Sequence, residues 1–242
     1  MRLLCDLGNT RIKWAWAEGA TLSGFGSGDY SGVEAYTTRL VGCARPTMIA
    51  AISVARHRNE AFVRFCEEQW ALAPQWYPSL REGFGVSSLY EPPETLGADR
   101  FAALAGARAR FPGQAVCVAD CGTAITVDAL DGDGVFQGGA ILPGLSAAAC
   151  ALRLIAPGLT GSPGDRFYAA YGRSTQDAVG GGLMLGAAGA IERLFRDQGA
   201  VLGHDVRLLL TGGDAARLAP YLSTPFEYVA HLTLEGLAVM VS

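Results

Sequence analysis

A short pattern that occurs twice constrains the fold of this chain more than any other feature. The two copies are residues 3–16 and 115–128. In each copy an apolar run ends in an acid, Asp6 or Asp120, and a small polar turn leads into an alternating segment. An apolar run, a turn and an alternating segment are typical of two strands joined as a hairpin. The repeat therefore predicts two domains of similar architecture.

Each hairpin continues into a third expected strand and then into alternating helices and strands. Hairpins at the start of each half and helices later predict an α/β fold with mixed sheets flanked by helices. The expected lobes are residues 1–113 and 114–242. The expected strands beyond the hairpins cover 21–26, 47–54, 75–77, 135–142 and 206–210, and the expected helices cover 31–41, 58–72, 101–110, 145–155, 174–195, 214–221 (capped by Asp214) and 231–241.

Composition excludes several classes of protein. Hydrophobic residues make up 50% of the chain and charged residues only 17%, which is typical of a globular protein. The net charge of −4 argues against nucleic-acid binding, which needs a basic surface. Apolar stretches such as 134–152 and 178–191 are short or interrupted, so we expect no membrane partner. An acid inside the N-terminal apolar run argues against a signal peptide, and we expect a cytoplasmic protein.

Cysteine and histidine usage argues against metal and hydrolase sites. The six cysteines form no C-x-x-C pair and have no histidine nearby, so we expect reduced core thiols. Only three histidines are present, and no G-x-S-x-G sequence accompanies them. A Ser-His-Asp or Cys-His hydrolase is therefore not expected.

The acidic turns are the first candidate site. A carboxylate at the end of a buried strand can hold Mg²⁺ directly or through water, and a turn of small residues can hold a phosphate. Either turn alone is also compatible with an ordinary hairpin, but its recurrence favours two turns closing on one nucleotide. The chain has no P-loop and no early G-x-G-x-x-G sequence. Lys13, its only lysine, either contacts phosphate or has no special role.

The segment Gly97-Ala98-Asp99-Arg100 is the second candidate site, and it opens an expected helix. An acid beside an arginine at a helix N-terminus has a general explanation in the helix dipole and a surface ion pair. The functional alternative is an aspartate that accepts the proton of a substrate hydroxyl during phosphoryl transfer.

Five segments, taken in order, resemble the type III pantothenate kinases. They are residues 6–13, 97–100, 120–128, 138–144 and 172–175, and a turn at 211–214 follows them. That family belongs to the superfamily of acetate and sugar kinases, heat-shock ATPases and actin. The resemblance implies two ribonuclease H-like domains of the actin-like ATPase superfamily. It also implies phosphorylation of pantothenate by ATP to 4'-phosphopantothenate, the first step of coenzyme A biosynthesis.

The resemblance assigns roles residue by residue. Asp99 is implied as the proton acceptor, Asp120 as the ligand of a monovalent cation (potassium or ammonium), and Asp6 as the Mg²⁺ ligand. The implied ATP-binding residues are Asp6, Leu7, Gly8, Asn9, Thr10, Arg11, Ile12, Lys13 and Thr123. The implied pantothenate-binding residues are Tyr90, Gly97, Ala98, Asp99, Arg100 and Thr175.

Family resemblance further implies a homodimer with pantothenate near the subunit interface, and it leaves open whether Thr175 acts in its own subunit or in the partner. Two alternatives to the function remain. One is a kinase of the same superfamily for another small hydroxyl substrate, which would keep both phosphate turns. The other is a nucleotide-binding regulatory protein of the same fold.

Overall fold

The computed structural model describes residues 1–30, 35–159, 161, 168–203 and 205–242. The chain forms two compact units. Unit 1 comprises Met1–Gly113, Gly134–Phe136 and His231–Ser242, and unit 2 comprises Gln114–Asp133 and Gln137–Ala230. The expected lobes were 1–113 and 114–242, whereas the packing places the segments 134–136 and 231–242 with unit 1.

Unit 1 is built on a five-stranded mixed sheet of order β3-β2-β1-β4-β5. The strands are β1 (Arg2–Leu7), β2 (Arg11–Glu18), β3 (Thr21–Asp29), β4 (Met48–Ser53) and β5 (Gln75–Trp76). β1 pairs antiparallel with β2 and parallel with β4, as a hairpin followed by a crossover requires. The expected hairpin at the start of the chain and the mixed character of the sheet are therefore confirmed.

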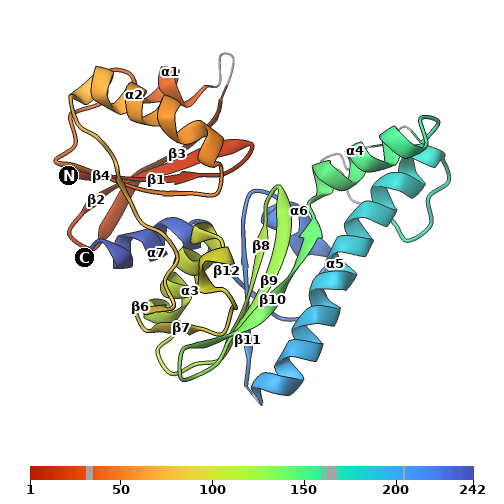
Figure 1. Ribbon diagram of the computed structural model, residues 1–242. Coiled ribbons are helices and arrows are strands. Elements are labelled where there is room, and N and C mark those ends of the chain that lie inside the picture. The colour runs from red at the N-terminus through yellow and green to blue at the C-terminus, as the bar shows by residue number, and fades with distance from the viewer. Residues whose placement is uncertain (31–34, 160, 162–167, 204) are drawn as a thin grey trace. The chain divides into compact units, whose positions relative to one another are not determined.

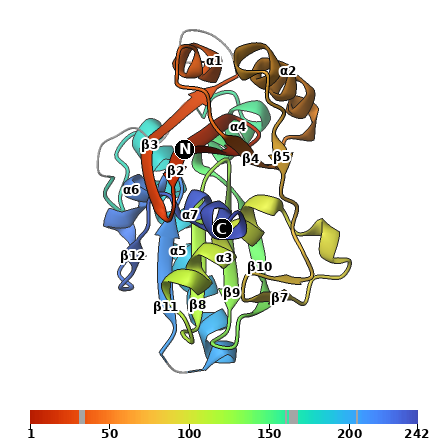
Figure 2. The ribbon, with the colours of Figure 1, turned by 90° about the vertical axis from the view of Figure 1, so that its left-hand side faces the viewer.

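Helices cover both faces of this sheet (Figures 1 and 2). They are α1 (Tyr36–Leu40), α2 (Asn59–Trp70), α3 (Ala98–Arg110) and α7 (Leu232–Met240). Phe62 and Trp70 of α2 join the buried core of strands β1, β2 and β4 on one face. The helix expected over 31–41 includes residues 31–34, which lie outside the described residues. Within the rest of that range the structure has α1.

The pairing of α3 with α7 explains why the end of the chain packs with unit 1. A methyl group added at Gly106 of α3 would lie 2.7 Å from the carbonyl oxygen of Leu232, and one added at Gly236 would collide with the carbonyl of Ala102. The two backbones therefore approach as closely as glycine allows. α7 is apolar on nearly all sides, so it needs this buried position.

Unit 2 repeats the hairpin arrangement. Its strands run in the order β12-β11-β8-β9-β10. They are β8 (Val116–Cys121), β9 (Ala124–Leu130), β10 (Val135–Pro143), β11 (Arg207–Thr211) and β12 (Glu227–Tyr228). β8 pairs antiparallel with β9 and parallel with β11, so the sheet is again mixed. The first residues of β10 belong to unit 1, where Val135 pairs with Ser87.

Two long helices and one short helix complete unit 2. They are α4 (Leu145–Ile155), α5 (Thr175–Leu202) and α6 (Ala215–Leu218). α5 lies along the sheet in Figure 1, and its Met184 and Ile191 join the core formed by β8, β9 and β11. By length and hydropathy alone, α5 also has the properties of a membrane span, but these side chains are part of the core.

The glycines of α5 fall into two groups. Methyl groups at Gly180 and Gly181 would meet the ring or Cβ of Tyr168, so close packing within unit 2 explains these two positions. Gly182, Gly186 and Gly189 have no other atom of the described residues within 4 Å of an added methyl group. This second group forms an open stripe along one side of the helix.

Several short elements have no counterpart among the expectations. They are β6 (Glu82–Gly83), β7 (Val86–Ser88), β12 and the 3-10 helices η1 (Arg56–Arg58) and η2 (Pro93–Thr95), whereas the 3-10 helix η3 (Ala219–Tyr221) lies within the helix expected over 214–221. Runs of two or three residues are too short to carry a periodic pattern. The expected cap by Asp214 is wrong, because its carboxylate accepts a hydrogen bond from Arg217 at 2.7 Å and makes no cap hydrogen bond.

All six cysteines are free thiols, but they do not all lie in the core. Cys5, Cys66, Cys117 and Cys121 are buried, as expected. Cys43 is half-buried and Cys150 is exposed on α4, so the expectation of core thiols is wrong for these two.

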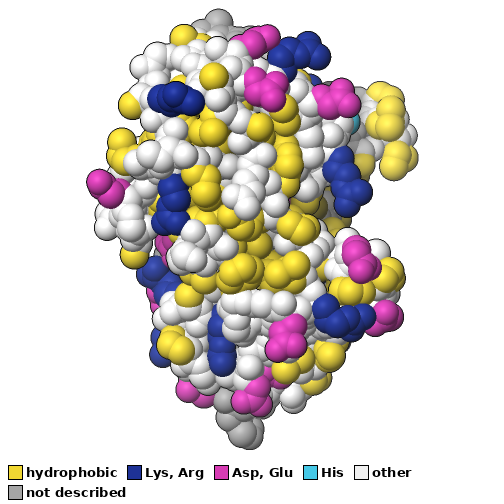
Figure 3. Space-filling model, turned by 60° about the vertical axis from the view of Figure 1, so that its left-hand side comes forward, with side chains coloured by type: hydrophobic (Ala, Val, Ile, Leu, Met, Phe, Trp, Pro, Cys, Tyr) yellow, Lys and Arg dark blue, Asp and Glu magenta, His cyan; other side chains and the backbone are white. Residues whose placement is uncertain are grey.

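On the face that Figure 3 shows, basic side chains are interspersed with acidic ones.

Candidate active site

The first acidic turn lies at the carboxyl end of β1. Asp6 is 6% exposed and is paired in register with Lys13 of β2, so the two side chains share one face of the sheet. The amide of Gly8 donates to the carbonyl of Arg11 at 3.0 Å and closes the turn. A carboxylate, an ammonium group and a turn of small residues together suit a metal-bound phosphate.

Within this segment the side chains divide between core and solvent. Leu7 and Ile12 are fully buried, so either one can serve a nucleotide only through its backbone. Asn9, Thr10 and Arg11 are exposed at the tip of the turn, where their side chains are accessible. The hairpin therefore alternates between residues that anchor it in the core and residues that face a ligand.

Tyr30, which follows β3, holds the turn from outside. Its hydroxyl donates to the carbonyl of Gly8 at 2.6 Å. Burial raises the pKa of Tyr30, and the nearby Asp6 carboxylate raises it further. The phenol therefore stays protonated and remains a donor at physiological pH.

The second candidate site is brought to the same end of the unit 1 sheet. The amide of Val54, just past β4, donates to the carbonyl of Leu7 at 3.1 Å. A methyl group added at Gly97 would lie 3.5 Å from Cγ1 of the same valine. Val54 thus links the turn after β1 to the start of α3, where Asp99 lies.

Asp99 lies in the first turn of α3, and its carboxylate folds back over Gly97. Oδ1 of Asp99 accepts a hydrogen bond from the amide of Arg100 at 2.7 Å. A methyl group at Gly97 would lie only 2.5 Å from the same oxygen. A carboxylate in the first turn is also stabilised by the helix dipole. These interactions define the position of the carboxylate.

The guanidinium of Arg100 is buried against two neighbouring aromatic rings. It is 5.2 Å from the centroid of Tyr90 and 5.7 Å from that of Phe136, and it donates to the Tyr90 hydroxyl at 2.9 Å. Arg100 is 7% exposed, and a buried cation on aromatic faces keeps its charge at low desolvation cost. The geometry presents one cation and one hydroxyl for an anionic, hydroxyl-bearing substrate.

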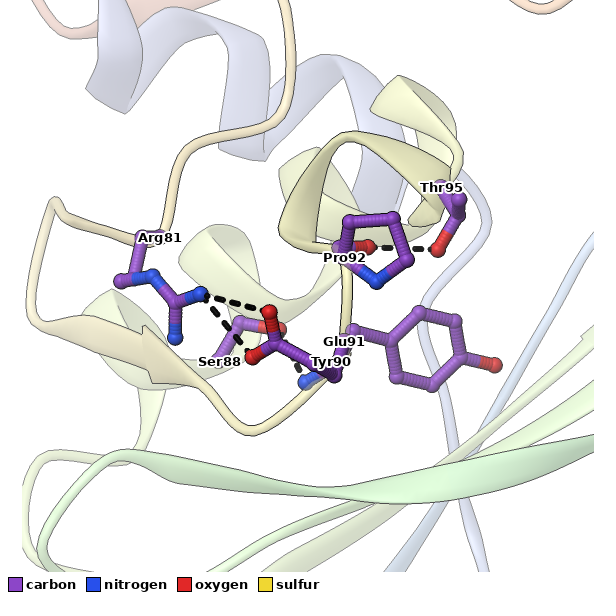
Figure 4. Close-up of polar contacts among 6 residues, drawn as sticks. All are labelled: Arg81, Ser88, Tyr90, Glu91, Pro92 and Thr95. Atoms are coloured by element: carbon purple, nitrogen blue, oxygen red, sulfur yellow. Dashed lines mark hydrogen bonds and ion pairs between the residues drawn. The ribbon is translucent and has the colours of Figure 1, made fainter.

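Figure 4 shows how the loop before α3 directs Tyr90. The amide of Tyr90 donates to Oγ of Ser88 at 3.2 Å, and the exposed pair of Arg81 and Glu91 lies on the opposite side from the Tyr90 ring. The hydroxyl of Thr95 donates to the carbonyl of Pro92 and closes η2. The ring of Tyr90 is therefore turned toward Arg100 by its backbone contacts.

Unit 2 presents the second acidic turn. Asp120, near the end of β8, is paired in register with Thr211 of β11. A methyl group at Gly212, whose φ is +97°, would collide with Oδ1 of Asp120 and with the backbone of Cys121. The amide of Gly144 donates to the carbonyl of Thr123 at 3.1 Å. The turn at 211–214 is therefore packed directly against the Asp120 turn.

Thr175 is the first residue of α5 and is exposed. Ser174 caps this helix, because its hydroxyl accepts the amide of Asp177 at 3.1 Å. Unit 2 therefore holds Asp120, Thr123 and Thr175, while unit 1 holds the first turn and the residues around Asp99.

Sequence reasoning missed four residues of this site. Tyr30, Val54 and Phe136 contact the motifs directly, and the guanidinium of Arg58 lies 4.7 Å from the ring centroid of Tyr30. None of the four lies in a motif, and only their three-dimensional neighbours indicate a role. The turn after β11 did carry a signal in the sequence, because the adjacent pair Gly212-Gly213 favours a turn, and Gly212 adopts a positive φ there.

Comparisons with known proteins identify the family of this chain. The family model described as "Type III pantothenate kinase" matches residues 2–197. A type III pantothenate kinase from Aromatoleum aromaticum is 40% identical over 250 residues, which cover 99% of this chain and 97% of that protein.

Solved structures show the same fold. A Campylobacter jejuni structure described as a Baf family transcriptional activator superposes with a TM-score of 0.62 at 23% identity and covers 99% of this chain and 96% of that one. The activator of 2-hydroxyisocaproyl-CoA dehydratase from Clostridium difficile, with bound ADPNP, superposes with a TM-score of 0.56 at 13% identity and covers 98% and 91%. At these identities the likeness shows the fold alone.

The two mixed sheets and their structural neighbours define an actin-like ATPase fold, and the family match defines a kinase within it. The chain belongs to the type III pantothenate kinase family. It is a pantothenate kinase that uses ATP, and it acts in coenzyme A biosynthesis.

Proposed function

We propose that the residues described above divide the reaction between them. Asp6, Lys13 and the turn amides hold the phosphates of ATP, and Arg100 with Tyr90 holds pantothenate. Asp99 accepts the proton of the substrate hydroxyl. The observation that supports this division best is the link through Val54, which brings the start of α3 to the same sheet edge as the turn after β1.

The proposed chemistry is a direct phosphoryl transfer. As the hydroxyl oxygen of pantothenate bonds to the γ-phosphorus of ATP, the bond from that phosphorus to the bridging oxygen of ADP breaks. The hydroxyl proton moves to the carboxylate of Asp99. Positioning and charge stabilisation carry most of the catalysis in such transfers, because the transition state is loose.

The donor set of unit 1 suits Mg²⁺. Among the described residues there is no cluster of three or more histidine, cysteine or carboxylate side chains. Mg²⁺ commonly takes one or two protein carboxylates and completes its shell with phosphate oxygens and water, so Asp6 beside a phosphate turn fits it. When bound, the ion neutralises charge on the transferring phosphate.

Asp120 is the proposed ligand of a potassium or ammonium ion. Its carboxylate lies against the turn at Gly212, beside the backbone carbonyl oxygen of Cys121. Carbonyl oxygens can replace the hydration shell of potassium, so one carboxylate with a neighbouring carbonyl oxygen suits a monovalent cation.

We also propose that the chain forms a homodimer through α5. Gly182, Leu185, Gly186 and Gly189 are exposed at the spacing of one helical face. Small residues at this spacing let a second helix approach closely, and burial of this face would offset the cost of glycine in a helix. Thr175 at the start of the same helix would then lie near the subunit boundary.

The remaining proposals concern location and partners. A cytoplasmic location suits six free cysteines, since thiols stay reduced there. We propose no nucleic-acid or membrane partner, a view supported by the net charge of −4. Cell fractionation with an antibody would test the location, and sedimentation at nanomolar concentration would test the dimer. A fully active monomer would contradict the dimer proposal.

A coupled assay tests the division of roles. We expect ADP formation that depends on pantothenate, ATP and Mg²⁺, with higher activity in potassium than in sodium. Asp6→Asn should raise the Mg²⁺ concentration needed for half-maximal rate. An unaltered Mg²⁺ requirement in that variant would remove Asp6 from the metal site. A panel of other hydroxyl substrates tests selectivity for pantothenate.

A further inference from the structure

One side chain outside every sequence motif binds the phosphate turn directly. Tyr30 donates its hydroxyl proton to the carbonyl oxygen of Gly8 at 2.6 Å. Inside the turn, the amide of Gly8 donates to the carbonyl of Arg11 at 3.0 Å. The two hydrogen bonds restrain both sides of the same glycine.

The ring that carries this hydroxyl is itself fixed. The guanidinium of Arg58, in η1, lies 4.7 Å from the Tyr30 ring centroid. The ring of Tyr36, in α1, meets it edge-on at a centroid distance of 5.9 Å. A cation on one face and an aromatic ring at the edge leave the Tyr30 side chain little freedom. Its hydroxyl is therefore held in place before any ligand binds.

The hydrogen bond to Gly8 has a consequence for the next residue. A trans peptide unit is planar, and its carbonyl and amide groups point in opposite directions. An oxygen of Gly8 that is drawn toward Tyr30 therefore directs the N–H of Asn9 away from Tyr30. Asn9 is exposed at the tip of the turn, so this amide is open to a ligand.

We propose that Tyr30 is a positioning residue for ATP: its hydroxyl fixes the peptide between Gly8 and Asn9 so that the Asn9 amide faces a phosphate oxygen. The inference rests on the proposed role of the turn after β1 as the phosphate site. Preorganised amides bind phosphate without the cost of ordering a loop, and this is the contribution that the tyrosine makes.

The variant Tyr30→Phe tests this with the smallest change, because it removes the hydroxyl and keeps the ring under Arg58. We expect the KM for ATP to rise about threefold to tenfold, the effect of one hydrogen bond on binding. The KM for pantothenate should stay within about twofold, because the hydroxyl that is removed bonds to the phosphate turn and not to a residue assigned to pantothenate.

Tyr36→Phe is the matched control. It removes a tyrosine hydroxyl from the same aromatic cluster, and among the described residues that hydroxyl makes no hydrogen bond. A purely structural role for Tyr30 predicts that both variants lower the unfolding temperature while the KM for ATP stays unchanged in each. Positioning predicts that only Tyr30→Phe raises the KM for ATP.

Two further variants separate the ways in which the idea can fail. Lys13→Met probes the phosphate turn itself, and if it leaves the KM for ATP unchanged, the turn is not the phosphate site and both proposals fall. If Lys13→Met raises that KM and folded Tyr30→Phe does not, the positioning role alone is overturned.

Arg58→Met loosens the Tyr30 ring and leaves its hydroxyl in place, and it should raise the KM for ATP by a smaller factor. This variant keeps the test available if Tyr30→Phe does not fold.

Discussion

The carboxylate of Asp99 lies where a side chain at position 97 would be, so only glycine fits there. Oδ1 of Asp99 lies 2.5 Å from the position where a β-carbon on Gly97 would be. The same oxygen accepts the amide of Arg100 at 2.7 Å, so the carboxylate cannot shift without breaking a hydrogen bond. The absence of a side chain at position 97 therefore sets the location of the proposed proton acceptor.

Gly97→Ala should lower kcat through this contact. We expect a loss of up to about 100-fold, since a displacement of about 1 Å in a catalytic group can cost that much. Fold stability should fall only modestly, by about 1 kcal/mol, because Gly97 is the N-cap residue of α3 and alanine is a poorer N-cap than glycine. Gly199→Ala is the control and should retain full activity, because within the described part of the chain an added methyl group at this helix position meets no other side chain or neighbouring element within 4 Å. Equal activity in both variants would show that catalysis does not depend on the absence of a side chain at position 97.

Asp99→Asn should remove the proton acceptor and leave the shape of the site intact. We expect kcat to fall by a factor on the order of 100 or more, the usual effect of losing a general base. ATP should still bind, because the proposed phosphate turn is a different segment. Steady-state kinetics together with nucleotide binding by calorimetry would check both parts. Turnover at the level of the unchanged protein would exclude Asp99 from the mechanism.

The parts of the fold that carry a strong local pattern were predictable from the sequence. β1 with β2, and β8 with β9, follow from an apolar run, an acidic turn and an alternating segment. The packing of α7 was not predictable, because it depends on two glycines, Gly106 and Gly236, that lie 130 positions apart and meet only in the folded chain. A helix that is apolar all round does not indicate in the sequence which unit will bury it.

The site likewise combines residues that a sequence motif indicates with residues that meet the motifs only in the folded chain. Asp6 and Asp99 lie within motifs, so their candidacy needed no coordinates. Phe136 packs against Tyr90 with a centroid distance of 5.3 Å and tilted rings, yet it comes from a strand that begins in unit 1 and continues into unit 2. Contacts of this kind arise from chain crossings, and no spacing rule along the sequence indicates them.

Thiol reactivity should follow burial in a graded way. Burial raises the pKa of Cys66 and of Cys117 to about 12, so at pH 8 almost none of either thiol is the reactive thiolate. Cys150 is exposed and should react first with iodoacetamide, followed by half-buried Cys43. Mass spectrometry of the native protein after short labelling would show this order, and full labelling in urea would serve as the reference. Early modification of Cys117 would contradict the burial described for β8.

Adjacent glycines in the turn after β11 offer the sharpest test of the unit 2 site. Gly212 has a φ of +97°, and a methyl group there would lie 2.5 Å from the amide nitrogen of Cys121 and would also collide with the Asp120 carboxylate. Gly212→Ala should therefore distort the Asp120 turn and raise the KM for ATP at least about tenfold, since both the backbone strain and the collision must be relieved. Gly213→Ala is the matched control, because an added methyl group there meets no other atom of the described residues within 4 Å. Kinetics in potassium and in sodium would show whether Gly212→Ala also weakens the dependence on the monovalent cation. An ATP KM that is the same in both variants would mean that nucleotide binding does not involve the Asp120 turn.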